Sequence, residues 1–197
     1  MKLLEAAGNG SCLFISMRLG IELLKILELE KPGVLNGRDG RILKSSEDLR
    51  EIIVSWYYNG LEKTVDSFGS YTEACAEACA AMWTREDIIA NELHNLSSKD
   101  VPEKGPERRK AVLSYLDIMK KTGTWGGTPE YTALALIAKC NVTVYCDNKI
   151  ISSIKTNDSL KTILLRFSGR NHYDLLITDD QADALKRIMP HLNLQDC

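Results

Sequence analysis

Residues 7–14 constrain this chain most, because they place two glycines and two small polar residues directly before a cysteine, Cys12. Gly8 and Gly10 allow a tight turn whose backbone N–H groups are free to point at a ligand. Apolar residues then recur at helical spacing, which predicts a buried helix from Cys12 to about Glu30. The first turn of a helix favours a thiolate, so Cys12 is a candidate nucleophile. The alternative is a small core residue after a loop.

Composition predicts one globular domain, residues 1–197, with 44% hydrophobic and 26% charged residues. The net charge of −2 gives no electrostatic case for a nucleic-acid partner. No signal peptide is visible and no apolar run approaches the length of a membrane span, so we expect no membrane partner. We also expect a monomer.

The six cysteines show no paired metal-ligand spacing. Cys75 and Cys79 lie four residues apart on an Ala-rich segment, where small residues more often permit close helix packing than bind zinc. We therefore expect no metal site. Free thiols predict a reducing compartment, which is the cytoplasm, or the host cytosol for a protein secreted by a pathogen.

Helical patterns precede strand patterns along the chain. We expect helices over residues 45–60, 74–83, 84–93 and 112–119, and a further helix that begins at Thr128-Pro129. Ser45 and Asp48 form a capping box at the start of the first of these helices, and Gly123 is the expected C-terminal cap of the helix over 112–119. Residues 97–107 are expected to form an exposed connection. Strands follow over residues 142–146, 149–153, 163–167 and 172–177, with Asp147-Asn148 as a hairpin turn and a last helix from about Asp180. This order predicts an α+β fold with an antiparallel or mixed sheet.

Of the three histidines, one stands out. His94 and His191 occupy polar positions and are expected at the surface. His172 opens an apolar strand and Asp174 follows two residues later, on the same face of that strand. A carboxylate there holds the imidazole in one tautomer and stabilises its cation. Together with Cys12, this pair forms the nucleophile, base and orienting acid of a thiol hydrolase.

Three blocks of sequence resemble the ovarian-tumour (OTU) cysteine proteases, which remove ubiquitin from proteins. Residues 9–14, Asn-Gly-Ser-Cys-Leu-Phe, resemble that family's Asp-Gly-Asn-Cys-Leu-Phe nucleophile motif. Trp125-Gly126-Gly127, with Glu130 and the helix after it, resembles its Trp-Gly-Gly segment. Residues 169–174 resemble its closing His-Tyr-Asp/Asn strand. The blocks occur in the family's order and cover nearly the whole chain.

The resemblance implies a papain-like OTU fold, with a small mixed or antiparallel sheet between helices, and hydrolysis of the isopeptide bond after the C-terminal glycine of ubiquitin. Ubiquitin or polyubiquitin is the implied partner, and no cofactor is needed. Cys12, His172 and Asp174 are the implied triad, and Trp125, Gly126 and Gly127 the implied channel for the ubiquitin tail. The Trp125 side chain is also explained as a packed core indole beside a tight turn.

Two positions depart from the family pattern. Asn9 stands where the family has Asp, and Ser11 where it has Asn. Asn9 cannot supply a negative charge. The backbone N–H groups of Asn9, Gly10 and Cys12 still fit an oxyanion hole, since that role needs no side chain.

The helical segment 45–107 matches no motif of the family and is the expected surface for the body of ubiquitin. The tail of ubiquitin is basic, so acidic residues are expected along its approach; the candidates are Asp66, Glu73, Glu77, Glu86 and Asp87, which a solvated helix face explains equally well. Two other functions remain open: a non-catalytic ubiquitin-binding module, and a papain-like thiol hydrolase or transferase that acts on another substrate.

Overall fold

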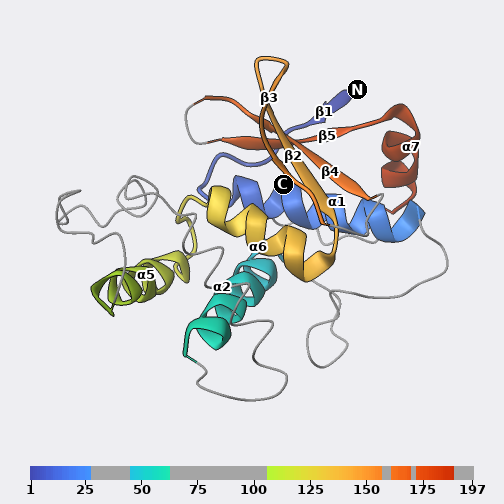
Figure 1. The fold of residues 1–197 in the computed structure, drawn as a ribbon. Helices are drawn as coiled ribbons and strands as arrows, with labels where there is room; N and C mark the ends of the chain where they lie inside the picture. The colour runs from blue at the N-terminus through green and yellow to red at the C-terminus, as the bar shows by residue number, and fades with distance from the viewer. Residues whose placement is uncertain (28–44, 63–105, 157–160, 170–171, 189–197) are drawn as a thin grey trace.

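Among the described residues, helices predominate before β2 and strands after α6 (Figure 1). The computed structural model describes residues 1–27, 45–62, 106–156, 161–169 and 172–188. Their elements are, in order, β1 (Lys2–Leu4), α1 (Cys12–Leu27), α2 (Ser46–Glu62), α5 (Pro106–Met119), α6 (Thr128–Ala138), β2 (Asn141–Cys146), β3 (Lys149–Ile154), β4 (Thr162–Phe167), β5 (Tyr173–Ile177) and α7 (Asp179–Ile188). The predicted α+β class is confirmed.

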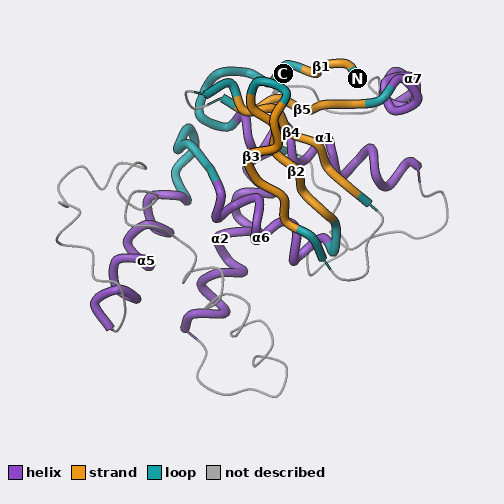
Figure 2. The backbone as a smooth tube through the Cα atoms, turned by 45° about the horizontal axis from the view of Figure 1, so that its top comes forward, coloured by secondary structure: helices purple, strands orange, loops and turns teal. Residues whose placement is uncertain are grey.

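The five strands that the structure describes form one mixed sheet in the order β1-β5-β4-β2-β3. β2 and β4 pair in parallel, whereas the other three neighbouring pairs are antiparallel. Figure 2 shows the strands side by side, with α1, α2 and α6 grouped next to them. The parallel pair makes the sheet mixed, which is one of the two forms that the sequence predicts.

The predicted hairpin joins β2 to β3 through Asp147 and Asn148. Their φ angles are 48° and 62°, and positive φ at both central residues is what a type I′ turn requires. Asn and Asp tolerate this left-handed region better than most residues. The predicted turn is therefore confirmed.

The first strand, β1, was absent from the predicted elements. It pairs antiparallel with β5, with Leu3 opposite Leu176. Three residues are too few to show the alternation by which a strand is identified in a sequence. Pairing with β5 makes this short edge strand stable, and it brings the first residues of the chain beside the strand that carries Asp174.

Helix α1 packs against β4 and β5 and carries much of the core. Phe14 and Met17 on α1 and Leu165 on β4 are fully buried. Gly20 lies against the sheet: a Cβ atom at this position would lie 2.8 Å from Cγ2 of Ile163. The glycine inside the helix thus marks a close approach of helix and sheet, at the usual cost of glycine to helix stability.

The start of α2 follows the predicted capping box. The backbone N–H of Ser45 donates to Oδ2 of Asp48 (2.9 Å), and the N–H of Asp48 donates to Oγ of Ser45 (3.1 Å). The helix continues to Glu62, so the predicted end at Asn59-Gly60 is wrong. One glycine costs a helix only about 1 kcal/mol, which the packing of this buried helix outweighs.

Two further boundaries differ from the prediction. α5 begins at Pro106, so the last two residues of the predicted connection 97–107 belong to a helix. Proline suits the first turn of a helix, where its missing N–H has no partner to lose. Gly123 is not the cap of α5, which ends at Met119. It lies instead in a turn in which the N–H of Thr124 donates to the carbonyl of Lys121 (3.2 Å). The φ angle of Gly123 in this turn is 85°.

Several predictions fall outside the described residues, namely the helices over 74–83 and 84–93 and most of the connection 97–107. Among the helices that are described, none has the length and apolar character to cross a bilayer.

Candidate active site

Cys12 is the first residue of α1 and is only 1% exposed. The helix begins here because the carbonyl of Ser11 accepts the first helical hydrogen bond, from the N–H of Ile15 (2.9 Å). The glycine-containing loop ends at Ser11, and the apolar residues of α1 that follow pack on the sheet. The predicted position of Cys12, at the start of a buried helix, is confirmed.

The backbone N–H of Tyr173 lies 3.5 Å from the Cys12 sulfur, although the two residues are 161 positions apart in the chain. Tyr173 is the residue between His172 and Asp174. Its carbonyl accepts a hydrogen bond from Oγ of Ser16 on α1 (3.1 Å), which holds the start of β5 against the helix. The fold therefore brings the two predicted halves of the site together.

The environment of Cys12 differs from the expectation that its position favours a thiolate. Burial raises the pKa of the thiol above its ordinary value, and the negative charge of Asp174 acts in the same direction. The N–H groups of Tyr173 and Leu13 lower this pKa but do not outweigh burial. The expectation considered only the helix terminus and omitted the loss of solvent. Burial thus favours the protonated thiol, and a nucleophilic role for Cys12 would need a base to remove its proton.

His172 and Asp174 form the predicted pair. Nε2 of His172 lies 2.8 Å from Oδ1 of Asp174. The histidine is 28% exposed and the carboxylate is fully buried. His172 lies directly before β5 rather than opening it, because the strand begins at Tyr173. The contact that the strand geometry predicts nevertheless forms.

The nitrogen that faces Asp174 determines what the other nitrogen can do. An ionised carboxylate only accepts hydrogen bonds, so Nε2 carries a proton in the neutral imidazole. The lone pair of that tautomer is then on Nδ1, which is the atom that can accept a proton. The geometry therefore suits a histidine that accepts a proton at Nδ1 while Nε2 faces the carboxylate.

Asp174 has two further partners that the sequence analysis missed. The backbone N–H of Ala6 donates to Oδ1 (3.2 Å), and Nη2 of Arg166 donates to Oδ2 (2.7 Å). Arg166 lies directly opposite Asp174 in the antiparallel pairing of β4 and β5. The predicted strand bounds gave no correct signal for this pairing, because a second strand that begins at His172 places Arg166 opposite Tyr173. The strand begins one residue later, at Tyr173, and this shift brings Arg166 opposite Asp174.

The loop before Cys12, which contains Asn9, Gly10 and Ser11, needs glycine at one position to follow its path. Gly10 has φ of 85°, and a Cβ atom there would lie 1.8 Å from the carbonyl oxygen of Gly123. The Asn9 side chain is used within the loop, where its Oδ1 accepts a hydrogen bond from the N–H of Ser11 (3.2 Å). The predicted oxyanion hole, built from the N–H groups of Asn9, Gly10 and Cys12, stays a prediction.

A buried arginine that the sequence analysis missed, Arg50 on α2, forms hydrogen bonds to this loop and to the segment before α6. Its Nη2 donates to Oγ of Ser11 (3.3 Å) and to the carbonyl of Thr124 (2.9 Å). Its guanidinium also lies over the Phe14 ring, 4.0 Å from the ring centroid. Oγ of Ser11 in turn donates to Oε1 of Glu47 (3.1 Å). Ser11, one of the two departures from the OTU pattern, therefore joins the loop to α2.

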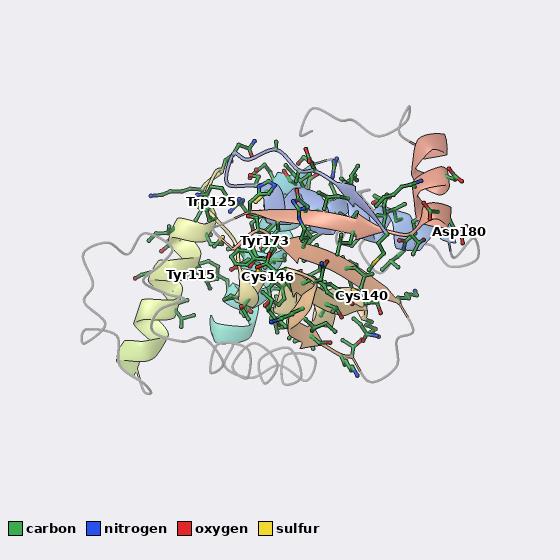
Figure 3. All side chains as sticks on the ribbon, turned by 90° about the horizontal axis from the view of Figure 1, so that it is seen from above. Tyr115, Trp125, Cys140, Cys146, Tyr173 and Asp180 are labelled. Carbon is green, nitrogen blue, oxygen red and sulfur yellow. The ribbon has the colours of Figure 1, made fainter. Side chains whose placement is uncertain are left out.

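The Trp125-Gly126-Gly127 segment packs on the start of α1. A Cβ atom on Gly126 would lie 2.9 Å from side-chain atoms of both Leu13 and Phe14, so a larger residue there would require these two side chains to shift. Trp125 is half-buried and packs against the core. Figure 3 shows Trp125 on the segment that leads into α6, and Tyr173 at the opposite end of β5 from Asp180 on α7. The role of this segment as a substrate channel stays a prediction.

Glu130 anchors the same segment from inside the protein. It is fully buried, and its Oε2 accepts a hydrogen bond from the N–H of Gly127 (2.6 Å). Its Oε1 accepts one from the hydroxyl of Tyr115 (2.7 Å). Burial raises the pKa of Glu130 to about 7, although both hydrogen bonds act to lower it. Its geometry fits a residue that positions Gly127 rather than one that meets substrate.

The remaining predicted site residues lie outside the described residues. These are the acidic candidates Asp66, Glu73, Glu77, Glu86 and Asp87. The same holds for Cys75 and Cys79, interpreted as packing residues, and for His94 and His191, expected at the surface. Among the residues that are described, no three His, Cys, Asp or Glu side chains are grouped so that they could hold a metal ion.

No protein-family model matches the chain, and no curated protein matches it by sequence. Among solved structures, an OTU deubiquitinase from Wolbachia pipientis wMel matches at 17% identity with a TM-score of 0.50, over 94% of this chain and 94% of the other. The Legionella pneumophila deubiquitinase Ceg23 matches at 14% identity with a TM-score of 0.54, over 97% of this chain and 85% of the other. The chain therefore has the fold of the OTU deubiquitinases.

Proposed function

We propose that this chain is a deubiquitinase, which hydrolyses the isopeptide bond after the C-terminal glycine of ubiquitin with Cys12 as nucleophile. His172 is the general base and acid, and Asp174 orients it. The OTU fold and the three sequence blocks support this assignment together. Ubiquitin or a polyubiquitin chain is the proposed partner.

One observation carries the proposal. The Cys12 sulfur lies 3.5 Å from the backbone N–H of Tyr173, the residue that follows His172 and precedes Asp174 in the chain. Nε2 of His172 lies 2.8 Å from Oδ1 of Asp174, so the fold brings the cysteine to the segment that carries this pair. Burying the Asp174 carboxylate costs free energy, which supports a role for the pair beyond packing. A cysteine, a histidine and a carboxylate in one segment of the fold support the proposed roles of nucleophile, base and orienting acid.

The reaction proceeds through a thioester. Nδ1 of His172 takes the thiol proton, and the Cys12 sulfur attacks the carbonyl carbon of the terminal glycine. The tetrahedral oxyanion collapses, the bond to the lysine nitrogen breaks, and His172 gives its proton to the leaving amine. His172 then removes a proton from water, which attacks the thioester and releases ubiquitin and the free thiol. Because burial raises the pKa of Cys12, proton transfer to His172 is part of the first step.

The direct test is reaction with a ubiquitin that carries an electrophile at its C-terminus. We expect a covalent adduct at Cys12, identified by mass spectrometry, and cleavage of a ubiquitin dimer by the unmodified protein. Cys12→Ala abolishes both because it removes the nucleophile. Cys146→Ala is the matched control, since Cys146 is also a free cysteine but is only partly buried and lies on the sheet. A Cys12→Ala variant that still cleaves the dimer at a comparable rate would contradict the mechanism.

A non-catalytic ubiquitin-binding module is the second candidate, and one observation favours it: Cys12 is only 1% exposed and burial raises its pKa. The same experiment separates the two functions. A module binds ubiquitin without forming an adduct. If the protein neither binds nor reacts, a thiol hydrolase or transferase for another substrate is the remaining reading of the site.

A further inference from the structure

Asp174 is a buried carboxylate whose two oxygens have different partners. Oδ1 faces Nε2 of His172 at 2.8 Å and the N–H of Ala6 at 3.2 Å. Oδ2 faces Nη2 of Arg166 at 2.7 Å, the shortest of the three contacts. A buried carboxylate is stable only when its oxygens are paired, and pairing with a guanidinium gives a strong, directional hydrogen bond.

Arg166 reaches Asp174 because of the strand register. The two residues are directly opposite each other on β4 and β5, so their side chains lie on the same face of the sheet. The Arg166 side chain is 43% exposed, whereas Asp174 is fully buried. Arg166 also lines an open groove of about 560 Å³ on this face, together with Tyr145 and Asn148. One end of the ion pair is therefore fixed inside the protein and the other is open to solvent.

We propose that Arg166 is a positioning residue for the catalytic pair. By holding Oδ2, Arg166 fixes the rotation of the Asp174 carboxylate, so that Oδ1 stays directed at Nε2 of His172. The imidazole then keeps its Nε2–H tautomer and presents Nδ1 as the base. The catalytic consequence of this inference rests on the proposed function, whereas its structural part concerns only the state of His172.

The first experiment measures kcat and KM for cleavage of a ubiquitin dimer by Arg166→Gln and Arg166→Lys. Arg166→Gln removes the charge and the strong hydrogen bond, so kcat falls by about 10- to 100-fold while KM stays unchanged. Arg166→Lys restores most of kcat, because it keeps a positive donor opposite Oδ2. Lys149→Gln is the matched control: it makes the same charge change on exposed residue 149 of β3, and its kcat equals that of the unaltered protein.

The second experiment needs no substrate. Nitrogen-15 NMR distinguishes the two neutral tautomers of histidine, and the chain has only three histidines, so the signal of His172 is assigned with a His172→Gln variant. In alkaline buffer we expect the Nε2–H tautomer alone in the unaltered protein, in Arg166→Lys and in Lys149→Gln. Arg166→Gln shows a mixture of tautomers, because the carboxylate no longer selects one. Thermal unfolding of each variant shows that it is folded.

The outcomes separate this inference from the proposed function. If the unaltered protein does not cleave ubiquitin, the proposed function fails, and the tautomer measurement still decides the role of Arg166. A single tautomer in Arg166→Gln overturns the inference, whether or not kcat falls, because the effect then does not pass through Asp174 and His172. An unchanged kcat in Arg166→Gln, in a protein that cleaves ubiquitin, overturns it as well.

Discussion

Asn9 and Asp174 are the two side chains that the sequence offers as the third catalytic group, and the structure uses them differently. Asp174 accepts a hydrogen bond from His172, whereas Asn9 accepts one from the N–H of Ser11 within its own loop. Asp174→Ala should therefore lower kcat by about three to four orders of magnitude, since the imidazole loses its orientation and its charge partner. Asn9→Ala loses one local hydrogen bond and should cost about tenfold or less.

Steady-state cleavage of a ubiquitin dimer by both variants measures this difference. A larger loss for Asn9→Ala than for Asp174→Ala would assign the third catalytic role to the loop side chain instead.

At the scale of one residue, Glu130 also leads to a prediction about how the free energy of unfolding depends on pH. Its pKa is 4.5 in an unstructured chain and about 7 in the folded protein, so between these values the folded state holds a proton that the unfolded state has lost. Its contribution to stability therefore falls as pH rises through this window, by at most about 1.4 kcal/mol per pH unit. Glu130→Gln keeps an acceptor for Gly127 and does not titrate, so its free energy of unfolding lacks this slope.

Chemical denaturation at a series of pH values, taken as the difference between Glu130→Gln and the unaltered protein, isolates the effect from other carboxyl groups. Glu51→Gln serves as the control, since Glu51 is an exposed carboxyl on α2. A difference between Glu130→Gln and the unaltered protein that does not change across this pH window would show that Glu130 is not protonated in the folded state.

At the scale of elements, the loop before Cys12 packs against the turn at Gly123. Gly10→Ala meets both a φ of 85° and the carbonyl of Gly123, so the loop must move. We expect the rate of adduct formation with the electrophilic ubiquitin to fall on the order of 100-fold, because a displacement of about 1 Å at the nucleophile is enough for such a loss. Gly8→Ala is the matched control: a Cβ atom there meets nothing within 4 Å.

The readout is the rate of adduct formation with the electrophilic ubiquitin, alongside far-ultraviolet circular dichroism to verify the fold. Equal rates for the two alanine variants would mean that the contact between Gly10 and Gly123 does not set the position of Cys12.

The elements that the sequence predicts well are those with a local signal at a defined position. The capping box placed the start of α2, Thr128-Pro129 placed that of α6, and Asp147-Asn148 placed the hairpin. The end of α2 was wrong because tertiary packing overrides the propensity of one glycine. β1 was missed because three residues carry no local pattern, and its pairing with β5 exists only in the fold.

The same division holds for the site. The proximity of His172 to Asp174 and the place of Cys12 at a helix start could be predicted from residue type, spacing and resemblance. Arg50 was not, because it reaches Ser11 through a packing of α2 that no local pattern encodes. The pKa of Cys12 was judged in the wrong direction for a related reason: a helix start is visible in the sequence, whereas the burial that outweighs it exists only in the fold.

At the scale of the whole molecule, the edge strand β1 supports the catalytic strand. Removing residues 1–4 removes the strand that pairs with one edge of β5. It also removes the support that holds Ala6 in place, and the N–H of Ala6 donates to Asp174 (3.2 Å). We expect kcat to fall on the order of tenfold and the temperature of half-unfolding to decrease. Lys2→Ala is the control, since it removes only the exposed ion pair with Asp179, and exposed ion pairs contribute little to stability.

Calorimetry and dimer cleavage test the two expectations separately. If the truncated protein kept its full kcat, Ala6 would have no part in holding Asp174.

The pairing of β5 with β1 and β4 also determines when the proposed active site is complete during synthesis. Cys12 is made early, whereas His172 and Asp174 are added only shortly before and within β5. A domain folds as a unit, so its sheet closes only after β5 has been made. On the proposed mechanism, a chain that ends before His172 has a cysteine and no base to activate it. The proposed thiol chemistry is therefore confined to chains that have closed the sheet.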